Sequence, residues 1–275
     1  MATVRHRRLA RELRILRERC GLRSEAVALE LGWDRSKVSR LETARVKPKL
    51  ADITELLDLY GVTSPERDAL IQLAKDARQR GWWRAFGDVF EGTYIGLESE
   101  ADSIRSWQPQ VVPGLLQTED YARAILTAAC PDTLERTEQR VRARMARKPL
   151  LNRPGRPPSF HAIVDEAVLR HMVGGRDVLR AQLSELWAAS QRPNITLQVM
   201  PFEAGAHPGV DGAFVILGYL EDLDPDVVYV EGQAGSVFPE STEEVTRFRL
   251  IWERLVDAAL SPADSAALLV ELTRE

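Results

Sequence analysis

The sequence has little cysteine: Cys20 and Cys130 are the only two among 275 residues. That is too few for a disulfide framework or a cysteine-rich metal site, so we expect both thiols to be reduced. The chain has four histidines, and none of them has the spacing of metal ligands: His6, His161, His171 and His207. No glycine-rich phosphate loop precedes a predicted helix. The sequence therefore predicts no metal, no cofactor, no catalytic residue and no enzyme activity.

Long apolar runs are also missing. No stretch approaches the roughly 18 consecutive apolar residues of a membrane span. Residues 1–8 are basic, but they lead into a charged helix instead of the apolar core of a secretory signal. A hydrophobic fraction of 44% with 28% charged residues is typical of a soluble globular protein. We therefore expect a cytoplasmic protein without a membrane partner, and its length predicts two domains.

Charge is distributed unevenly along the chain. Residues 1–50 contain 14 Lys and Arg against 6 Asp and Glu, whereas residues 51–275 contain 23 against 35. The acidic excess is largest in residues 193–275, with 4 basic and 15 acidic side chains. A basic block favours binding to a polyanion, and the acidic remainder is repelled by DNA. We expect nucleic acid to meet only the N-terminal part.

Apolar residues spaced three and four apart predict five helices in the N-terminal part. The first ends at Gly21, and the fourth begins after Pro48 and ends at Gly61. Ser64 is predicted to cap the fifth, which has Pro65 in its first turn and continues to about residue 80. The second and third, residues 24–31 and 35–44, are separated by Gly32 and by Asp34 as an N-cap.

The second and third helices have the features of a helix-turn-helix motif. Gly32 permits the tight turn, Ala28 lets the helices approach, and four apolar residues form the shared face: Val27, Leu31, Val38 and Leu41. The second helix of such a motif lies in the major groove of double-stranded DNA. A dimer of the motif reads two half-sites, so we expect a homodimer on an inverted-repeat operator.

The exposed side of residues 35–44 supplies the expected DNA contacts. Side chains that can read bases are predicted at four positions: Arg35, Ser36, Ser39 and Arg40. Phosphate contacts are predicted for Ser24, Lys37 and Arg45. The alternative interpretation is a merely charged, solvated helix, which the combination of spacing, caps and basic block disfavours.

Residues 9–60 resemble the Cro/cI or XRE family of helix-turn-helix repressors, most specifically in the stretch Ser36-Lys-Val-Ser-Arg-Leu-Glu42. The resemblance implies an all-α, lambda-repressor-like domain of five helices, which we assign to residues 1–80. It also implies a structural ion pair between Arg17 and Glu42. One departure is Arg23, where the family usually has a Ser or Thr N-cap, so the start of the second helix stays open.

Residues 81–275 predict a second domain with an α/β fold, a mixed sheet with helices. Aromatic residues and glycines fill residues 82–94, where we place the domain boundary. Residues 118–129, 133–148 and 176–190 are predicted helices, and residues 159–165, 195–200, 213–219 and 227–231 are predicted strands. The helix between the first two strands predicts a parallel pair. A capping box at Ser241–Glu244 and the pair Ser261-Pro262 predict two closing helices.

The motif Pro113-Gly-Leu-Leu-Gln-Thr118, with Tyr94-Ile-Gly-Leu-Glu98, resembles the C-terminal domain of unknown function of a large group of actinomycete XRE regulators that includes WhiJ-like proteins. The resemblance implies an antitoxin-like regulator controlled by a small protein partner encoded nearby. Control by a small-molecule effector, or a main role as an adaptor that binds a partner protein, stays open. Lys148 departs from the glutamine that relatives tend to have.

Three other features have competing interpretations. Glu166 and Arg170, four residues apart, could form a functional polar site or an intrahelical ion pair, and such pairs are common. His207 could contact a ligand, but a simple loop role is favoured. The aromatic residues of 82–94 could form a ligand cage or a base-stacking platform, but interdomain core is favoured.

Overall fold

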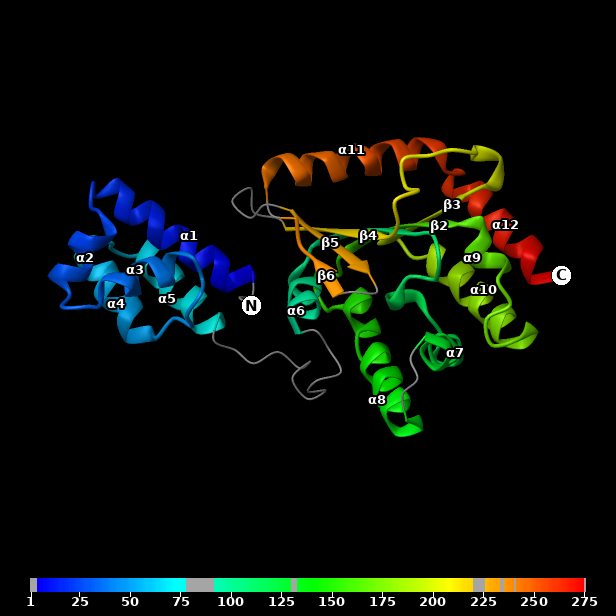
Figure 1. Cartoon of the computed structure of the whole chain (residues 1–275), viewed down its shortest axis with the longest axis horizontal. Helices are drawn as coiled ribbons and strands as arrows, with labels where there is room; N and C mark the ends of the chain where they lie inside the picture. The colour runs from blue at the N-terminus through cyan, green and yellow to red at the C-terminus, as the bar shows by residue number, and fades with distance from the viewer. Residues whose placement is uncertain are drawn as a thin grey trace. The chain divides into compact units, whose positions relative to one another are not determined.

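A computed structural model describes residues 4–77, 92–129, 133–219, 226–232, 235–239 and 241–274. The chain divides into two compact units, an N-terminal helical unit and a C-terminal unit built on a sheet (Figure 1). The predicted boundary at residues 80 and 81 lies outside the described residues, as do Cys130 and four of the aromatic residues of 82–94: Trp82, Trp83, Phe86 and Phe90. Of the described helices, none is long and apolar enough to cross a membrane.

The N-terminal unit contains the five predicted helices: α1 (Val4–Arg19), α2 (Ser24–Glu30), α3 (Arg35–Glu42), α4 (Leu50–Leu59) and α5 (Glu66–Asp76). Gly21, Gly32 and Gly61 follow α1, α2 and α4 with φ of 67°, 64° and 67°. These left-handed conformations are easily adopted by glycine and end a helix. The all-α expectation for this part is confirmed.

One apolar core holds these helices together. It takes residues from all five, and its most buried members are Leu9, Leu13, Val27, Ala28, Val38, Leu41, Ile53, Leu56, Leu57 and Ala74. Burial of a leucine or valine side chain contributes about 1.5–3 kcal/mol, so this shared core fixes the angle between α2 and α3.

Three predicted helix ends of this unit are wrong. Helix α5 ends at Asp76 instead of about residue 80. Helix α3 ends at Glu42 instead of residue 44, because Ala44 has a φ of 53° and lies in the left-handed region. Ser64 does not cap α5: Pro65 occupies the N-cap position, and the Ser64 hydroxyl donates to Asp68 Oδ2 at 2.8 Å. At the open start of α2, Arg23 is the N-cap residue and makes no side-chain cap.

The C-terminal unit contains a mixed six-stranded sheet of order β3-β2-β1-β4-β5-β6. Its strands are β1 (Ser103–Gln108), β2 (Ser159–Asp165), β3 (Ile195–Met200), β4 (Phe214–Gly218), β5 (Val227–Gly232) and β6 (Gly235–Val237). Strands β1, β2 and β3 are parallel, and β4, β5 and β6 are added antiparallel. The predicted α/β class and the predicted parallel pair are confirmed, but β1 and β6 were not predicted.

The described helices that follow α5 along the chain are α6 (Gly92–Glu100), α7 (Glu119–Ala129), α8 (Leu134–Met145), α9 (Glu166–Arg170), α10 (Arg176–Ser190), α11 (Thr242–Ala258) and α12 (Pro262–Arg274). Of these, α6 groups with the N-terminal unit. Short 3-10 turns are η2 (Gly114–Leu116), η3 (Lys148–Asn152) and η4 (Phe202–Ala204). The predicted capping box of α11 is present, because Ser241 accepts from Glu244 N and the Glu244 carboxylate accepts from Ser241 N.

Helix α11 covers one face of the sheet (Figure 1). Its Trp252 and Leu255 pack with Trp107 of β1, Ile163 of β2 and Ile216 of β4, and the Trp107 side chain is fully buried. Helices α10 and α12 pack against each other and against β3, the strand at one edge of the sheet.

Candidate nucleic-acid interface

Helix α3 has one buried side and one exposed side. Val38 and Leu41 are 0% and 2% exposed and join the core. All four predicted base-reading residues, Arg35, Ser36, Ser39 and Arg40, are exposed. The helix therefore presents two guanidinium groups and two hydroxyl groups to solvent, the donor types that read base edges in the major groove.

The N-terminus of α3 is fixed by Asp34. Its carboxylate accepts a hydrogen bond from Ser36 N at 3.0 Å and a second from the Ser36 hydroxyl. These bonds, led by the hydroxyl, lower the pKa of Asp34. Arg40 Nη2 lies 3.4 Å from the same carboxylate, a loose surface contact. The side chain of Arg40, from the last turn of α3, thus reaches back to the Asp34 cap and can exchange this contact for a base at little cost.

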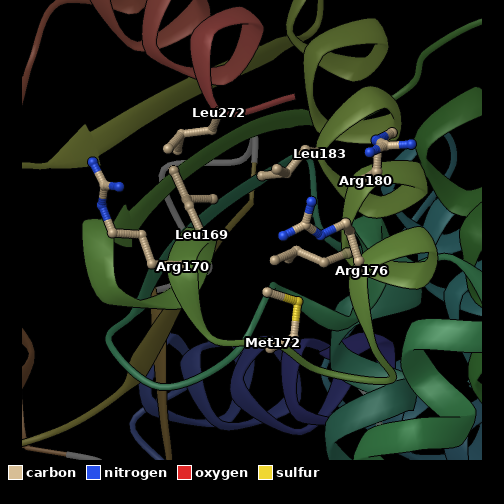
Figure 2. A pocket seen from close by; sticks show the side chains of 8 residues that line it. Leu169, Arg170, Met172, Arg176, Arg180, Leu183 and Leu272 are labelled. Carbon is tan, nitrogen blue, oxygen red and sulfur yellow. The ribbon is translucent and has the colours of Figure 1, made fainter. Parts of the chain in front are cut away.

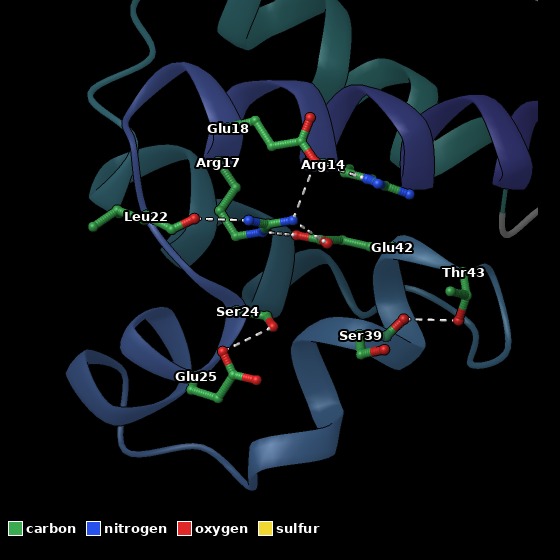
Figure 3. A network of polar contacts seen from close by, with 9 residues as sticks. All are labelled: Arg14, Arg17, Glu18, Leu22, Ser24, Glu25, Ser39, Glu42 and Thr43. Carbon is green, nitrogen blue, oxygen red and sulfur yellow. Dashed lines mark hydrogen bonds and ion pairs between the residues drawn. The ribbon is translucent and has the colours of Figure 1, made fainter.

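Figure 3 shows the network that joins α1 to the end of α3. Arg17 Nε donates to Glu42 Oε1 at 2.7 Å, and Arg17 Nη2 donates to Glu42 Oε2 at 3.0 Å. The third donor, Nη1, reaches the carbonyl of Leu22 at 2.7 Å, just before α2. The side chains of Arg17 and Glu42 are only 12% and 7% exposed. The ion pair that the family resemblance implied is therefore structural and unavailable to DNA.

Lys37, predicted to contact phosphate, has a partner within the protein. Its Nζ lies 2.7 Å from Asp52 Oδ1 on α4 and 3.5 Å from the ring centroid of Trp33. Trp33 Nε1 in turn donates to Glu55 Oε2 at 3.2 Å. These contacts connect α3 and the preceding turn to α4. The sequence interpretation missed these contacts, because the partners of Lys37 and Trp33 lie on another helix.

The other predicted phosphate contacts lie on either side of α3. Ser24 is half-buried at the first position of α2, and its hydroxyl contacts Glu25 Oε2 at 3.4 Å. Arg45, after α3, is exposed. The structure adds Lys47 and Lys49, exposed cations between α3 and α4 that the sequence interpretation did not assign. Together they extend the positive surface beyond the recognition helix.

The C-terminal motif of residues 113–118 has a structural role. The amide of Gln182, on α10 and fully buried, donates to Leu116 O at 2.9 Å, and its oxygen accepts from Thr118 N at 2.7 Å. Gln117 donates to Val112 O at 2.7 Å and accepts from Arg144 Nη1 at 2.9 Å. Two buried glutamine side chains thus hold the loop before α7.

The remaining polar features also have partners. Glu166 and Arg170 form an ion pair of 2.8 Å within α9, which agrees with the favoured interpretation. Lys148 pairs with Glu185 at 2.7 Å. His207 accepts from Gly209 N at 3.2 Å, and its ring packs edge-on against Trp107 at 5.2 Å. In the described ranges, no group of three or more His, Cys, Asp or Glu side chains has a metal-binding arrangement.

Comparison with known families agrees with this geometry. Residues 8–70 match a model described as a helix-turn-helix domain, which supports a role as a DNA-binding regulator. Residues 92–271 match a model described as a domain of unknown function, DUF5753. No curated protein and no solved structure matches the chain. The chain belongs to the DUF5753 family and has an XRE-like helix-turn-helix domain at its N-terminal end.

Proposed function

We propose that this protein is a sequence-specific transcriptional regulator, a repressor or autoregulator, that reads an operator in double-stranded DNA through α3. The observation that carries the proposal is the two-sided character of this helix. Val38 and Leu41 fix its buried side in the core, and four donor side chains, Arg35, Ser36, Ser39 and Arg40, lie exposed on it. Such a role places the protein in the cytoplasm and requires no catalysis and no cofactor.

We further propose that the protein acts as a homodimer on an inverted repeat. An α3 of eight residues covers only one half-site. A two-fold symmetric pair of α3 helices would read two half-sites about one helical turn apart, which raises affinity and specificity together.

Binding-site selection from random-sequence duplexes tests this proposal. The full chain should enrich an inverted repeat whose half-site centres lie about 10 base pairs apart. Sedimentation of the complex should give two chains per duplex. Selection that returns no enriched motif would contradict the proposal, and one chain per duplex would contradict the dimer alone.

For control of this activity we propose a small protein partner that binds the C-terminal unit. The excess of acidic residues in 193–275 supports a basic partner, because complementary charge speeds association. The product of an adjacent small gene should co-purify with the chain and bind it in calorimetry at micromolar concentration. An absence of binding heat would contradict this control. An antitoxin-like adaptor role predicts the same binding without any effect on transcription of other genes.

A further inference from the structure

A cavity of about 220 Å³ lies in the C-terminal unit between α9, α10 and the end of α12. Five apolar residues line it: Leu169, Met172, Leu179, Leu183 and Leu272. The side chains of Leu169, Leu183 and Leu272 face one another, and Met172 lies at the opposite side (Figure 2). An engineered apolar cavity of about 150 Å³ holds benzene, so this cavity has room for one ring or a short alkyl chain.

Three arginines line the same cavity, and they differ in how far they are neutralised. Arg170 is paired with Glu166 at 2.8 Å and extends away from the apolar side chains (Figure 2). Among the described residues, the Arg180 guanidinium has only a long contact with Asp177, at 3.9 Å. Arg176 makes no hydrogen bond or ion pair to any residue that the structure describes, and its guanidinium reaches toward the middle of the cavity (Figure 2).

The loop that forms one wall of the cavity is held in place. It connects α9 to α10 and contains Gly174 and Gly175, whose φ values are 70° and 92°. A Cβ atom at Gly174 would lie 2.8 Å from Val178 Cγ1 and 3.1 Å from Ala124 Cβ. The loop backbone at Gly174 is therefore packed closely against α10 and α7, two residues from Met172. A wall held in this way is typical of a preformed ligand site.

We propose that this cavity binds a small amphipathic anion. The apolar body of the ligand lies among the leucines. Its carboxylate or phosphate head group forms an ion pair with the guanidinium of Arg176, and Arg180 lies beside it. Guanidinium groups bind both head groups through paired, charge-assisted hydrogen bonds. The inference goes beyond the proposed regulator function, because it depends on the cavity alone and its test contains no DNA.

Calorimetry with octanoate and octyl phosphate tests the proposal on the full chain. At least one of them should bind with one site per chain, and the comparison identifies the preferred head group. 1-Octanol, which lacks the charge, should bind about tenfold more weakly. Butanoate, with four fewer CH₂ groups, should bind more weakly than octanoate, by about fourfold for each CH₂ that octanoate buries and so by up to about 200-fold.

Two matched variants test the assigned arginine. Arg176→Gln should weaken the better anion about tenfold, because the head group loses its charged donor. Arg254→Gln removes an exposed guanidinium of α11, outside the cavity, and should leave affinity unchanged. Circular dichroism of both variants checks that they fold. Equal affinity of the wild type and Arg176→Gln would overturn the proposal, as would no binding of either anion at millimolar concentration.

The methionine methyl groups show where the anion binds. In protein labelled with ¹³C at these methyls, the anion should shift the signal of Met172, while Met145 and Met200 lie outside the cavity and serve as internal controls. A shift at Met145 or Met200 without one at Met172 would place the ligand elsewhere and overturn the assignment.

Discussion

Arg17 of α1 and Glu42 at the end of α3 form a nearly buried, two-point ion pair that connects the first helix of the N-terminal unit to the recognition helix. The same guanidinium also caps the carbonyl of Leu22, so one side chain joins α1, the start of α2 and α3. This arrangement holds the helix that presents the DNA-reading side chains.

Loss of this pair should destabilise the N-terminal unit. Arg17→Met leaves the Glu42 carboxylate buried without its partner, and such a loss costs about 3–5 kcal/mol. Hydrogen exchange of the amides of α1 and α3 in the full chain measures the effect. Arg14→Met is the matched control, because Arg14 and Glu18 are 62% and 52% exposed and such pairs contribute about 1 kcal/mol at most. If the amides of α1 and α3 were equally protected from exchange in the two variants, the structural role of the Arg17–Glu42 pair would be contradicted.

Lys37 and Arg45 should differ in their effect on the salt dependence of DNA binding. Arg45 is exposed, so Arg45→Ala should reduce the slope of log K against log salt by about 0.9, the value for one lost phosphate contact. The charge of Lys37 is already paired with Asp52, so Lys37→Ala should change the slope less.

Affinity titrations at several salt concentrations on unrelated duplexes measure both slopes. Asp52→Asn provides a further check, since it frees Lys37 and should strengthen binding to every duplex. Equal slopes for Lys37→Ala and Arg45→Ala would show that Lys37 leaves Asp52 and contacts a phosphate.

The helices of the N-terminal unit could be predicted from the sequence because the residues that begin and end them are close to those ends along the chain. Glycines at 21, 32 and 61 and the Asp34 cap lie within one turn of the ends that they define, and each has the expected conformation. The partners of Lys37 and Trp33 lie on another helix, at Asp52 and Glu55, so no local pattern indicated them.

Strand β1 was missed although it lies inside the sheet, between β2 and β4. Its sequence, SIRSWQ, contains only Ile104 and Trp107 as apolar residues, which is a weak strand signal. Its stability comes from the neighbouring strands β2 and β4, which lie more than 50 positions away in the sequence. Trp107 pairs with Ile163 of β2 and with Phe214 of β4. The hydrogen bonds of the buried Gln182 to Leu116 and Thr118 also join residues more than 60 positions apart.

His161 should make the C-terminal unit less stable in mild acid. Its Nε2 donates to Gln198 Oε1 at 2.6 Å, and its ring packs edge-on against Trp252. The pKa of His161 lies below the usual 6.5 because of burial and, less strongly, Arg105. The folded state therefore binds the proton less readily than the unfolded state, and stability falls as the pH decreases from about 6.5 toward the lowered pKa.

Melting temperatures between about pH 7 and pH 5 measure this effect, since that window brackets the histidine titration. His161→Gln should lose less stability over this range than the wild type. His171→Gln is the control, because His171 is exposed and should behave as the wild type does. If the melting temperatures of the wild type and of His161→Gln changed in parallel with pH, the proposed contribution of His161 would be contradicted.

Binding-site selection repeated with Arg40→Ala tests the central claim, that α3 reads bases, most directly. Arg40 is exposed on α3 beside the Asp34 cap, in reach of base edges once the helix enters the major groove. The account predicts that the variant keeps the wild-type motif except at one base pair of each half-site, where the preference falls by about 1–3 kcal/mol. An unchanged motif, or an affinity that falls equally for all sequences, would contradict it.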